Sequence, residues 1–260
     1  METGTGHKEN MTEPFSDNAF AQQTVLITGA TGGIGAVCAQ MFYDAGATVV
    51  LCDVDPATLD TFAASFEDED RAHTCSGDVT DPNVIESITA QIKHLKGVDH
   101  LILAAGIYKA QPLESMTNDQ FDQTLNINLR SVFQLCRALL PWIIDNGSIV
   151  NFTSIAGQRG SKNHAHYAAT KAALVAFGRS LAWEVGPRNI RVNAVSPGII
   201  ATTMTEELIA TNHDTLIQTT PLQRYGQASE VASAVVFLAS SAASFITGVN
   251  LEVNGGLHMG

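Results

Sequence analysis

The chain has 260 residues, 45% of them hydrophobic, and a formal net charge of −12. This length and composition allow one sizeable core, and the acidic balance argues against a nucleic-acid partner, because phosphate binding needs a cationic surface. No run of about 18 apolar residues occurs, so we expect neither a transmembrane helix nor a membrane partner.

Residues 1–23 are polar and predict a flexible tail. They lack the basic segment followed by an apolar segment that marks a secretory signal. The four cysteines lie in apolar or periodic segments without CxxC spacing, which predicts reduced, buried thiols in a cytoplasmic protein. These cysteines are Cys38, Cys52, Cys75 and Cys136.

From residue 24 onward, short apolar runs alternate with helical patterns of ten or more residues. The runs are apolar throughout, as strands of a parallel sheet covered on both faces require. The sequence therefore predicts a single doubly wound α/β domain over 24–260, with a seven-stranded, mostly parallel, Rossmann-like sheet. We expect strands at 24–29, 47–53, 72–78, 98–106, 147–154, 190–198 and 250–256, and helices at 33–46, 55–68, 81–95, 119–144, 163–186 and 228–240.

The segment 199–226 interrupts this alternation with a polar, irregular sequence. The long stretch between Pro197 and Pro221 predicts a mobile lid over a substrate pocket. The segment mixes apolar residues with threonines, and Arg224 is its one cation. This composition favours a neutral or modestly polar alcohol or ketone as the small-molecule substrate.

The sequence TGATGGIG joins the first expected strand to the first expected helix. Gly29, Gly33 and Gly35 would allow a tight turn and let the backbone approach a pyrophosphate, which the free N–H groups of the helix start would bind. Three glycines also occur in ordinary strand–helix connections, so the evidence is their position between a strand and an apolar-striped helix. No Gly-Lys-Ser/Thr follows, which argues against a nucleoside-triphosphate loop.

Asp53 ends the second expected strand, about where a dinucleotide fold places the acid that binds the adenosine ribose. A carboxylate there accepts hydrogen bonds from the ribose hydroxyls and repels a 2′-phosphate. Gly32 and Val54, expected beside that ribose, offer no positive charge. The sequence therefore predicts NAD(H) rather than NADP(H), although Asp53 could also be an ordinary turn residue.

Tyr167 and Lys171 lie four residues apart and would share one helix face. A free tyrosine has a pKa near 10, and a nearby ammonium would lower that pKa and make proton exchange with an alcohol or carbonyl feasible. Ser154 follows the fifth expected strand at its carboxyl end, where ligands of open α/β sheets bind, and its hydroxyl could hold the substrate oxygen.

Taken together, these motifs resemble the short-chain dehydrogenase/reductase family over nearly the whole chain. The resemblance rests on TGATGGIG, GDV at 77–79, NINL at 126–129, Ser154, the Tyr167-x-x-x-Lys171 pair and NAVSPG at 193–198. It implies a catalytic tetrad of Asn128, Ser154, Tyr167 and Lys171, with Tyr167 as the acid/base. Lys171 would shift its pKa and bind the ribose, and Asn128 would anchor a water in a proton relay.

The resemblance also implies positions that contact the cofactor. Asp78 would bind the adenine amino group, with Val79 beside the ring, and the backbone of Ile200 would face the nicotinamide carboxamide. The full expected set is Gly29, Thr31, Gly32, Gly33, Ile34, Gly35, Asp53, Val54, Asp78, Val79, Ala105, Gly106, Tyr167, Lys171, Pro197, Gly198, Ile200 and Thr202. A homotetramer is implied as well, formed through the Tyr167 helix and the C-terminal helix and strand at 228–253.

His164 and His166 precede Tyr167 and resemble a metal-binding pair. Residues two apart at a helix start point away from each other, and no third ligand lies nearby in the sequence, so we expect no metal site. His164 could instead line the substrate pocket.

The main hypothesis is an NAD(H)-dependent oxidoreductase that transfers a hydride between nicotinamide and a secondary alcohol or ketone. An alternative is a 3-oxoacyl-thioester reductase acting on acyl carrier protein or coenzyme A substrates, which many family members of this length are. The expected NAD preference argues against this alternative, since biosynthetic reductions usually use NADPH. A third possibility is an NAD-binding regulatory or scaffold protein, against which the intact tetrad argues.

Overall fold

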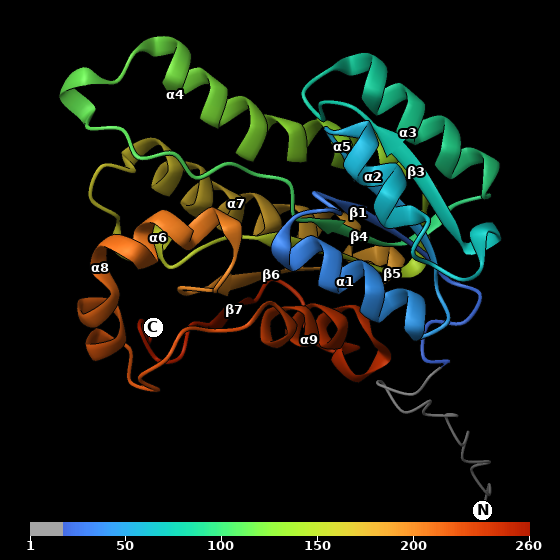
Figure 1. Cartoon of the computed structure of the whole chain (residues 1–260). Coiled ribbons are helices and arrows are strands. Elements are labelled where there is room, and N and C mark those ends of the chain that lie inside the picture. The colour runs from blue at the N-terminus through green and yellow to red at the C-terminus, as the bar shows by residue number, and fades with distance from the viewer. Residues whose placement is uncertain (1–17) are drawn as a thin grey trace, which may run out of the picture.

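A computed structural model describes residues 18–260, so most of the expected N-terminal tail lies outside the described residues. One seven-stranded sheet runs through the molecule in the order β3-β2-β1-β4-β5-β6-β7, and every neighbouring pair is parallel (Figure 1). This confirms the predicted doubly wound, Rossmann-like sheet. The strands are β1 (Thr24–Thr28), β2 (Thr48–Asp53), β3 (Ala72–Ser76), β4 (Val98–Leu103), β5 (Ile143–Phe152), β6 (Arg191–Pro197) and β7 (Asn250–Val253).

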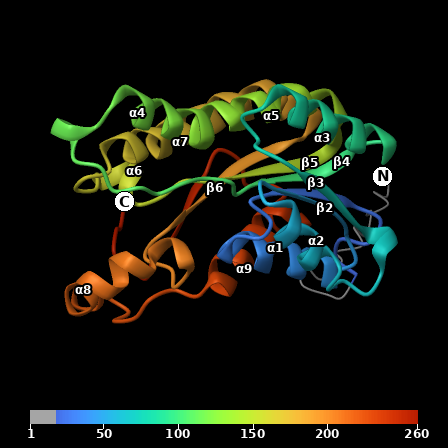
Figure 2. The ribbon, with the colours of Figure 1, turned by 45° about the horizontal axis from the view of Figure 1, so that its top comes forward.

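Helices cover both faces of the sheet (Figure 2). One face carries α1 (Gly33–Asp44), α2 (Pro56–Ala63) and α9 (Ala228–Ala239), and the other carries α3 (Pro82–His94), α5 (Ser131–Leu139) and α7 (Ala165–Val185). The remaining α-helices are α4 (Asn118–Leu125), α6 (Ala156–Arg159) and α8 (Glu206–Thr219). The shorter helical segments are η1 (Glu69–Arg71), η2 (Leu113–Ser115), η3 (Asn126–Arg130), η4 (Leu140–Trp142), η5 (Gly186–Arg188), η6 (Thr203–Thr205) and η7 (Ser241–Ala243).

The starts of α2 and α3 follow from their Asp-Pro sequences. Asp55 accepts a hydrogen bond from the backbone of Ala57, and Asp81 accepts one from Asn83, with proline at the first helical position in both cases. Each aspartate accepts a hydrogen bond from a backbone N–H group that has no partner within the helix. Proline has no backbone N–H, which costs nothing at the first helical position because an N–H there would have no partner within the helix. These caps fix where α2 and α3 begin, and hence the positions of the loops that follow β2 and β3.

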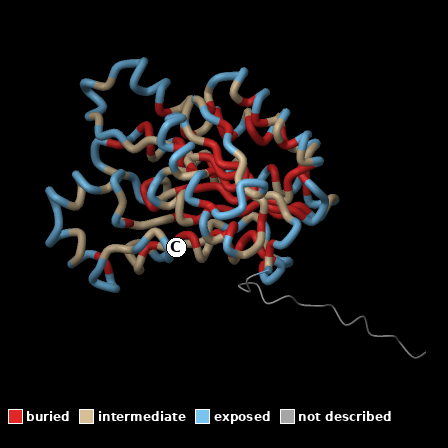
Figure 3. Tube along the Cα trace, turned by 45° about the vertical axis from the view of Figure 1, so that its right-hand side comes forward, coloured by how far each residue is buried: buried red, intermediate tan, exposed pale blue. Residues whose placement is uncertain are grey.

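The hydrophobic core forms one cluster on each side of the sheet, and burial concentrates along the strands (Figure 3). Ile27, Leu51 and Leu101 are fully buried. Burying such a side chain contributes roughly 1.5–3 kcal/mol, so the central strands form a rigid support for the loops at their carboxyl ends. All four cysteines are buried and free, as the sequence predicts.

The residues just before β1 differ from the expectation of a tail that extends to residue 23. Phe20 is 1% exposed and packs edge-to-face on Phe42 and His100. A single aromatic side chain in a polar stretch gives no periodicity from which this anchoring can be predicted. Among the described residues, no helix has both the length and the apolar character needed to cross a membrane.

The segment 199–226 is not irregular throughout, because it contains η6 and the helix α8. The sequence hides this helix, since its threonines and Asn212 disfavour helical structure and its apolar residues are few. Asn212 departs from helical geometry and kinks α8. None of the 14 residues of α8, all of them described, is buried.

Candidate active site

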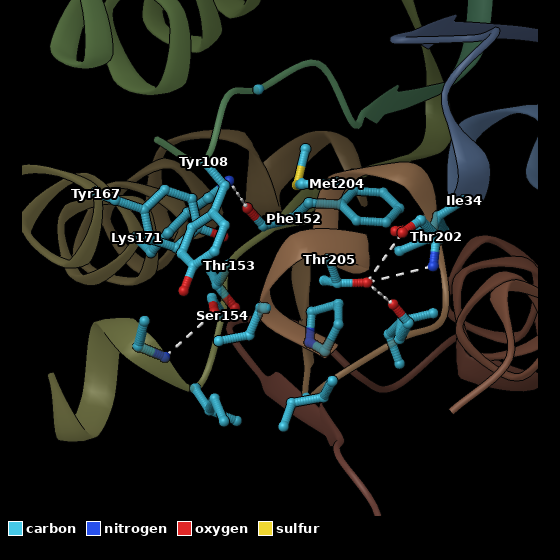
Figure 4. Close-up of a pocket in the computed structure, with 18 of the residues that line it drawn as sticks. Ile34, Tyr108, Phe152, Thr153, Ser154, Tyr167, Lys171, Thr202, Met204 and Thr205 are labelled. Carbon is cyan, nitrogen blue, oxygen red and sulfur yellow. Dashed lines mark hydrogen bonds between the residues drawn. The ribbon is translucent and has the colours of Figure 1, made fainter. Parts of the chain in front are cut away.

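A cavity of about 600 Å³ opens where β1, β4, β5 and β6 end (Figure 4). Ligands of doubly wound folds bind at this carboxyl edge. The cavity brings together the glycine turn, Ser154 after β5, and Tyr167 and Lys171 of α7. The predicted cofactor site therefore meets the predicted Ser154, Tyr167 and Lys171 at this cavity.

The glycine turn is packed so closely that side chains would not fit. A Cβ on Gly35 would lie 2.0 Å from the carbonyl oxygen of Gly29, and Gly29 itself has a φ of +67°. A Cβ on Gly33 would lie 2.7 Å from the Thr202 side chain, in the space beside the start of α1. Bare backbone N–H groups at a helix N-terminus form an anion-binding surface, so this turn fits a dinucleotide pyrophosphate.

The Asp53 carboxylate is held in place at the end of β2. Its Oδ2 accepts hydrogen bonds from the backbone and hydroxyl of Thr31, at 2.9 and 2.6 Å, and its Oδ1 accepts one from the backbone of Val54 at 2.7 Å. Val54 is 63% exposed. Asp53 therefore presents a fixed negative charge beside the glycine turn, a position that suits ribose hydroxyls better than a phosphate.

The predicted adenine-binding positions follow β3. The Asp78 carboxylate accepts a hydrogen bond from the backbone of Thr80 at 2.8 Å, and Val79 is 7% exposed. The backbone of Gly77 donates to the Asp53 carbonyl at 2.8 Å, which ties this loop to the end of β2. Both predicted adenine contacts thus lie in the loop that adjoins the predicted ribose contact.

Tyr167 is almost fully buried, at 9% exposure, and lines the cavity. Burial raises the pKa of Tyr167 to about 12, because the phenolate is poorly solvated there, and a hydrogen bond with Ser154 partly opposes this rise. The phenol is therefore protonated throughout the neutral pH range. In this form Tyr167 can donate a proton to a carbonyl oxygen.

The structure does not reproduce the expectation that Lys171 lowers the pKa of Tyr167. The Lys171 Nζ lies 5.5 Å from the centre of the Tyr167 ring and donates a hydrogen bond to the carbonyl oxygen of Phe152 at 2.7 Å. Burial lowers the pKa of Lys171 to about 8. The two side chains are adjacent, and burial favours the neutral form of each.

Asn128 reaches the site through a local irregularity of its helix. The expected continuous helix is interrupted by η3, a π-helical segment, and such segments are frequent at functional sites. Asn128 is 1% exposed; its Nδ2 donates to the Ile107 carbonyl at 2.9 Å, and its Oδ1 accepts from the Ile107 N–H at 2.8 Å. A Cβ on Gly106 would lie within 3.7 Å of both the Asn128 amide and the Lys171 amine, so these two side chains are neighbours.

Tyr108 also lines the cavity, and no sequence motif predicted it there. Its ring stacks face to face on His164, with centroids 4.0 Å apart and planes inclined by 2°, and it meets the Tyr167 ring edge-on at 4.8 Å. His164, expected as a pocket residue, is buried behind Tyr108 and is not part of the cavity lining. Tyr108 follows β4 in an irregular loop, so only the folded chain brings it to the catalytic tyrosine.

Two further cations lie at the cavity and were missed because they come from the end of α6 and the connection to α7, outside the expected lid. Arg159 and Lys162 are exposed and line the cavity. Arg224, the one cation of the lid sequence, instead pairs with Glu230 at 2.6 Å. The entrance to the cavity is therefore more cationic than the lid sequence alone predicts.

Most of the expected site residues line the cavity, and the others lie just behind it or along the nucleotide edge. Outside the cavity lining itself are Thr31, Asp53, Val54, Asp78, Val79, Ala105 and Asn128. Lining it are Gly29, Gly32, Gly33, Ile34, Gly35, Gly106, Ser154, Tyr167, Lys171, Pro197, Gly198, Ile200 and Thr202. Within residues 18–260, no three His, Cys, Asp or Glu side chains converge to hold a metal ion.

Comparison with known proteins gives matches over nearly the whole chain. A family model described as enoyl-(acyl carrier protein) reductase matches residues 29–258. A 3-oxoacyl-(acyl-carrier-protein) reductase of Rickettsia bellii is 38% identical over 239 residues, covering 91% of this chain and 97% of the relative. The corresponding reductase of Salmonella typhimurium is 39% identical over 246 residues, covering 93% and 99%.

A solved structure agrees with these sequence matches. A short-chain dehydrogenase/reductase of Brucella melitensis, described as a glucose/ribitol dehydrogenase, superposes with a TM-score of 0.91 at 43% identity. The match covers 94% of this chain and 100% of the other. The similarity therefore extends over nearly the whole fold.

Proposed function

The chain belongs to the short-chain dehydrogenase/reductase family of nicotinamide-dependent oxidoreductases, and we propose that it reduces the 3-oxo group of acyl thioesters with NADH. The observation that carries this proposal is the full-length similarity to two 3-oxoacyl-(acyl-carrier-protein) reductases. This similarity favours a carbonyl reductase of acyl chains over a general secondary alcohol dehydrogenase.

The chemistry assigned to the side chains follows from the protonation state of Tyr167. Reduced nicotinamide, when bound, supplies the hydride to C3 of the substrate. Tyr167 gives its proton to the carbonyl oxygen, and the Ser154 hydroxyl holds that oxygen while negative charge develops on it. The Lys171 ammonium stabilises the phenolate that Tyr167 becomes, and Asn128 holds the adjacent loop through Ile107. A tyrosine with a pKa of about 12 is in the acid form that reduction requires.

The shape and charge of the cavity support an acyl thioester. Met204, Leu208 and Leu216 give it an apolar wall from η6 and α8, which suits an acyl chain. Arg159 and Lys162 lie where the cavity meets solvent, and cations there suit the phosphate of a carrier arm.

The choice of NADH rests on Asp53. Its fixed carboxylate would repel a 2′-phosphate, and Gly32 and Val54 offer no compensating charge. We expect Asp53→Ala to reduce the ratio of kcat/KM with NADH to kcat/KM with NADPH about tenfold or more, because one repulsive contact is removed. A wild-type protein that is faster with NADPH would contradict this assignment.

Two other activities need to be separated from the proposed one. The family model is described by enoyl reduction, which adds hydrogen across C=C, and the fold also accommodates oxidation of simple secondary alcohols. A comparison of kcat/KM for acetoacetyl thioester, crotonyl thioester and secondary-alcohol substrates with the same protein separates the three activities. The proposal predicts the highest value for the acetoacetyl thioester, and a higher value for either of the others would overturn it.

We further propose a homotetramer in the cytoplasm, formed through α7 and through α9 with β7. Trp183 on α7 is 88% exposed and Phe245, shortly after α9, is fully exposed. An exposed aromatic residue on α7 and another in the connection between α9 and β7 support this assembly. Light scattering of the purified protein should give four times the chain mass, and a monomer mass would contradict the proposal.

A further inference from the structure

Tyr108 is held in one position from three directions. Its neighbour Ile107 is clamped by two hydrogen bonds to Asn128, and its ring stacks on His164. The Tyr108 ring also meets the Tyr167 ring edge to face (Figure 4). Half-buried in this way, it still lines the cavity. A side chain fixed on three sides and open on the fourth is preorganised to contact a ligand.

His164 is itself fixed, which makes the stack rigid. Its Nδ1 lies 2.7 Å from the Lys162 carbonyl oxygen, and because that oxygen can only accept, Nδ1 must carry the proton. Burial lowers the pKa of His164, so the ring is neutral when Tyr108 stacks on it. His164 therefore acts as a flat, uncharged support at the start of the helix that carries Tyr167.

The tyrosine hydroxyls of this site match a substrate with two oxygens. The Tyr108 and Tyr167 rings lie 4.8 Å apart, both beside the same cavity as Ser154. The Thr153 and Thr205 hydroxyls, which also line it, already donate to backbone carbonyl oxygens of Val195 and Ile200. A 3-oxoacyl thioester has two carbonyl oxygens separated by one methylene group, and a simple ketone has only one.

We propose that the Tyr108 hydroxyl binds the C1 carbonyl oxygen of a 3-oxoacyl substrate while Tyr167 and Ser154 bind the C3 oxygen, with His164 as the positioning residue that holds Tyr108. This inference rests on the proposed function and names the contact by which the site selects 1,3-dioxygenated substrates. A donor at C1 fixes which oxygen meets Tyr167, so C3 is the carbon that is reduced.

The test compares two substrates that differ in one oxygen. One is the acetoacetyl thioester of N-acetylcysteamine, and the other is the thioether of equal length in which the C1 carbonyl is a CH₂ group. Tyr108→Phe keeps the stacked ring and removes the hydroxyl. We expect kcat/KM for the thioester to fall about tenfold, mostly through KM, and kcat/KM for the thioether to stay within about twofold.

Two companion variants separate contact from support. His164→Phe keeps an aromatic support but loses the bond to Lys162, so it should retain more of the thioester activity than His164→Ala. His164→Ala should show the full thioester-selective loss, because Tyr108 is no longer held. Tyr43→Phe removes the hydroxyl that accepts a hydrogen bond from the Asp68 backbone, away from the cavity, and should leave both substrates unchanged. NADH binding and thermal unfolding of each variant show that the fold is intact.

The outcomes distinguish this inference from the function on which it rests. Equal losses on both substrates, or no loss on either, would overturn the role of Tyr108 and leave 3-oxoacyl reduction standing. If the wild-type protein reduces no 3-oxo substrate, the proposed function and the Tyr108 contact are both wrong.

Discussion

The glycine turn before α1 and the helix α8 line the same cavity, but packing fixes only the first. At Gly35 there is no space for even one additional carbon, because the Gly29 carbonyl would lie 2.0 Å from it. Along α8 no residue is buried, and the helix is kinked at Asn212. The cofactor side is thus determined by close backbone contacts, and the substrate side by a few half-buried side chains.

This difference has a consequence for function. The segment that binds a common cofactor needs one fixed geometry. A segment that recognises the substrate and carries little buried surface can change in sequence without disturbing the core. Substitutions in the first region should therefore affect folding or chemistry, and substitutions in α8 should affect substrate choice alone.

The largest expected effect is that of Tyr167→Phe. Removing the proton donor while keeping the ring should lower kcat by about 100- to 10,000-fold, the usual contribution of general acid catalysis. NADH affinity, followed by fluorescence titration, should change little. Activity close to that of the wild type would show that another group protonates the substrate.

Gly35→Ala should be the most damaging substitution in the turn. The added methyl group meets a backbone oxygen that cannot rotate away, so we expect a loss of about 1–3 kcal/mol in the free energy of unfolding, together with weaker NADH binding. Gly186→Ala is the matched control, since its Cβ meets nothing within 4 Å. Equal thermal midpoints for the two variants would mean that the turn is not tightly packed.

The pH dependence of reduction tests the role of Lys171. Its pKa is lowered to about 8, so the ammonium is present below this pH and is lost as the pH rises through it, while Tyr167, with a pKa of about 12, stays protonated. The rate of reduction should therefore be level near neutrality and fall above about pH 8. In Lys171→Arg, which stays charged, this fall should move to higher pH even if the overall rate is lower. A fall at the same pH in both proteins would assign it to another group.

The smallest expected effect is that of Leu208→Ala in α8. Because Leu208 is only half-buried, the free energy of unfolding should change by no more than about 0.5 kcal/mol, although KM for longer acyl chains should rise a few-fold. Denaturant titration and a chain-length series measure the two quantities. A large loss of stability would show that α8 is a structural element like α1.

The same contrast explains how much could be predicted from the sequence. The parallel sheet and the turn at Gly29 could be predicted because apolar strands, glycine spacing and Asp-Pro helix starts are local signals. The placement of Ser154 beside the Tyr167 helix follows from the fold, since strands of a parallel sheet all deliver their next residues to one edge. Lys171 shares a face of α7 with Tyr167 because the two are four residues apart.

What could not be predicted depends on contacts between distant segments. Phe20 is buried by residues of α1 and β4, and the pairing of Tyr108 with His164 joins two loops that are separate in the sequence. The high pKa of Tyr167 is likewise a result of burial, which is not evident from a spacing of four residues.

The most direct test of the account is the identity of the product formed from acetoacetyl thioester and NADH. Purified protein should form one 3-hydroxybutyryl thioester for each NADH consumed, as measured by chromatography and absorbance. Consumption of NADH without this product, or no consumption with any 3-oxoacyl thioester, would contradict the proposal that the chain is a 3-oxoacyl reductase.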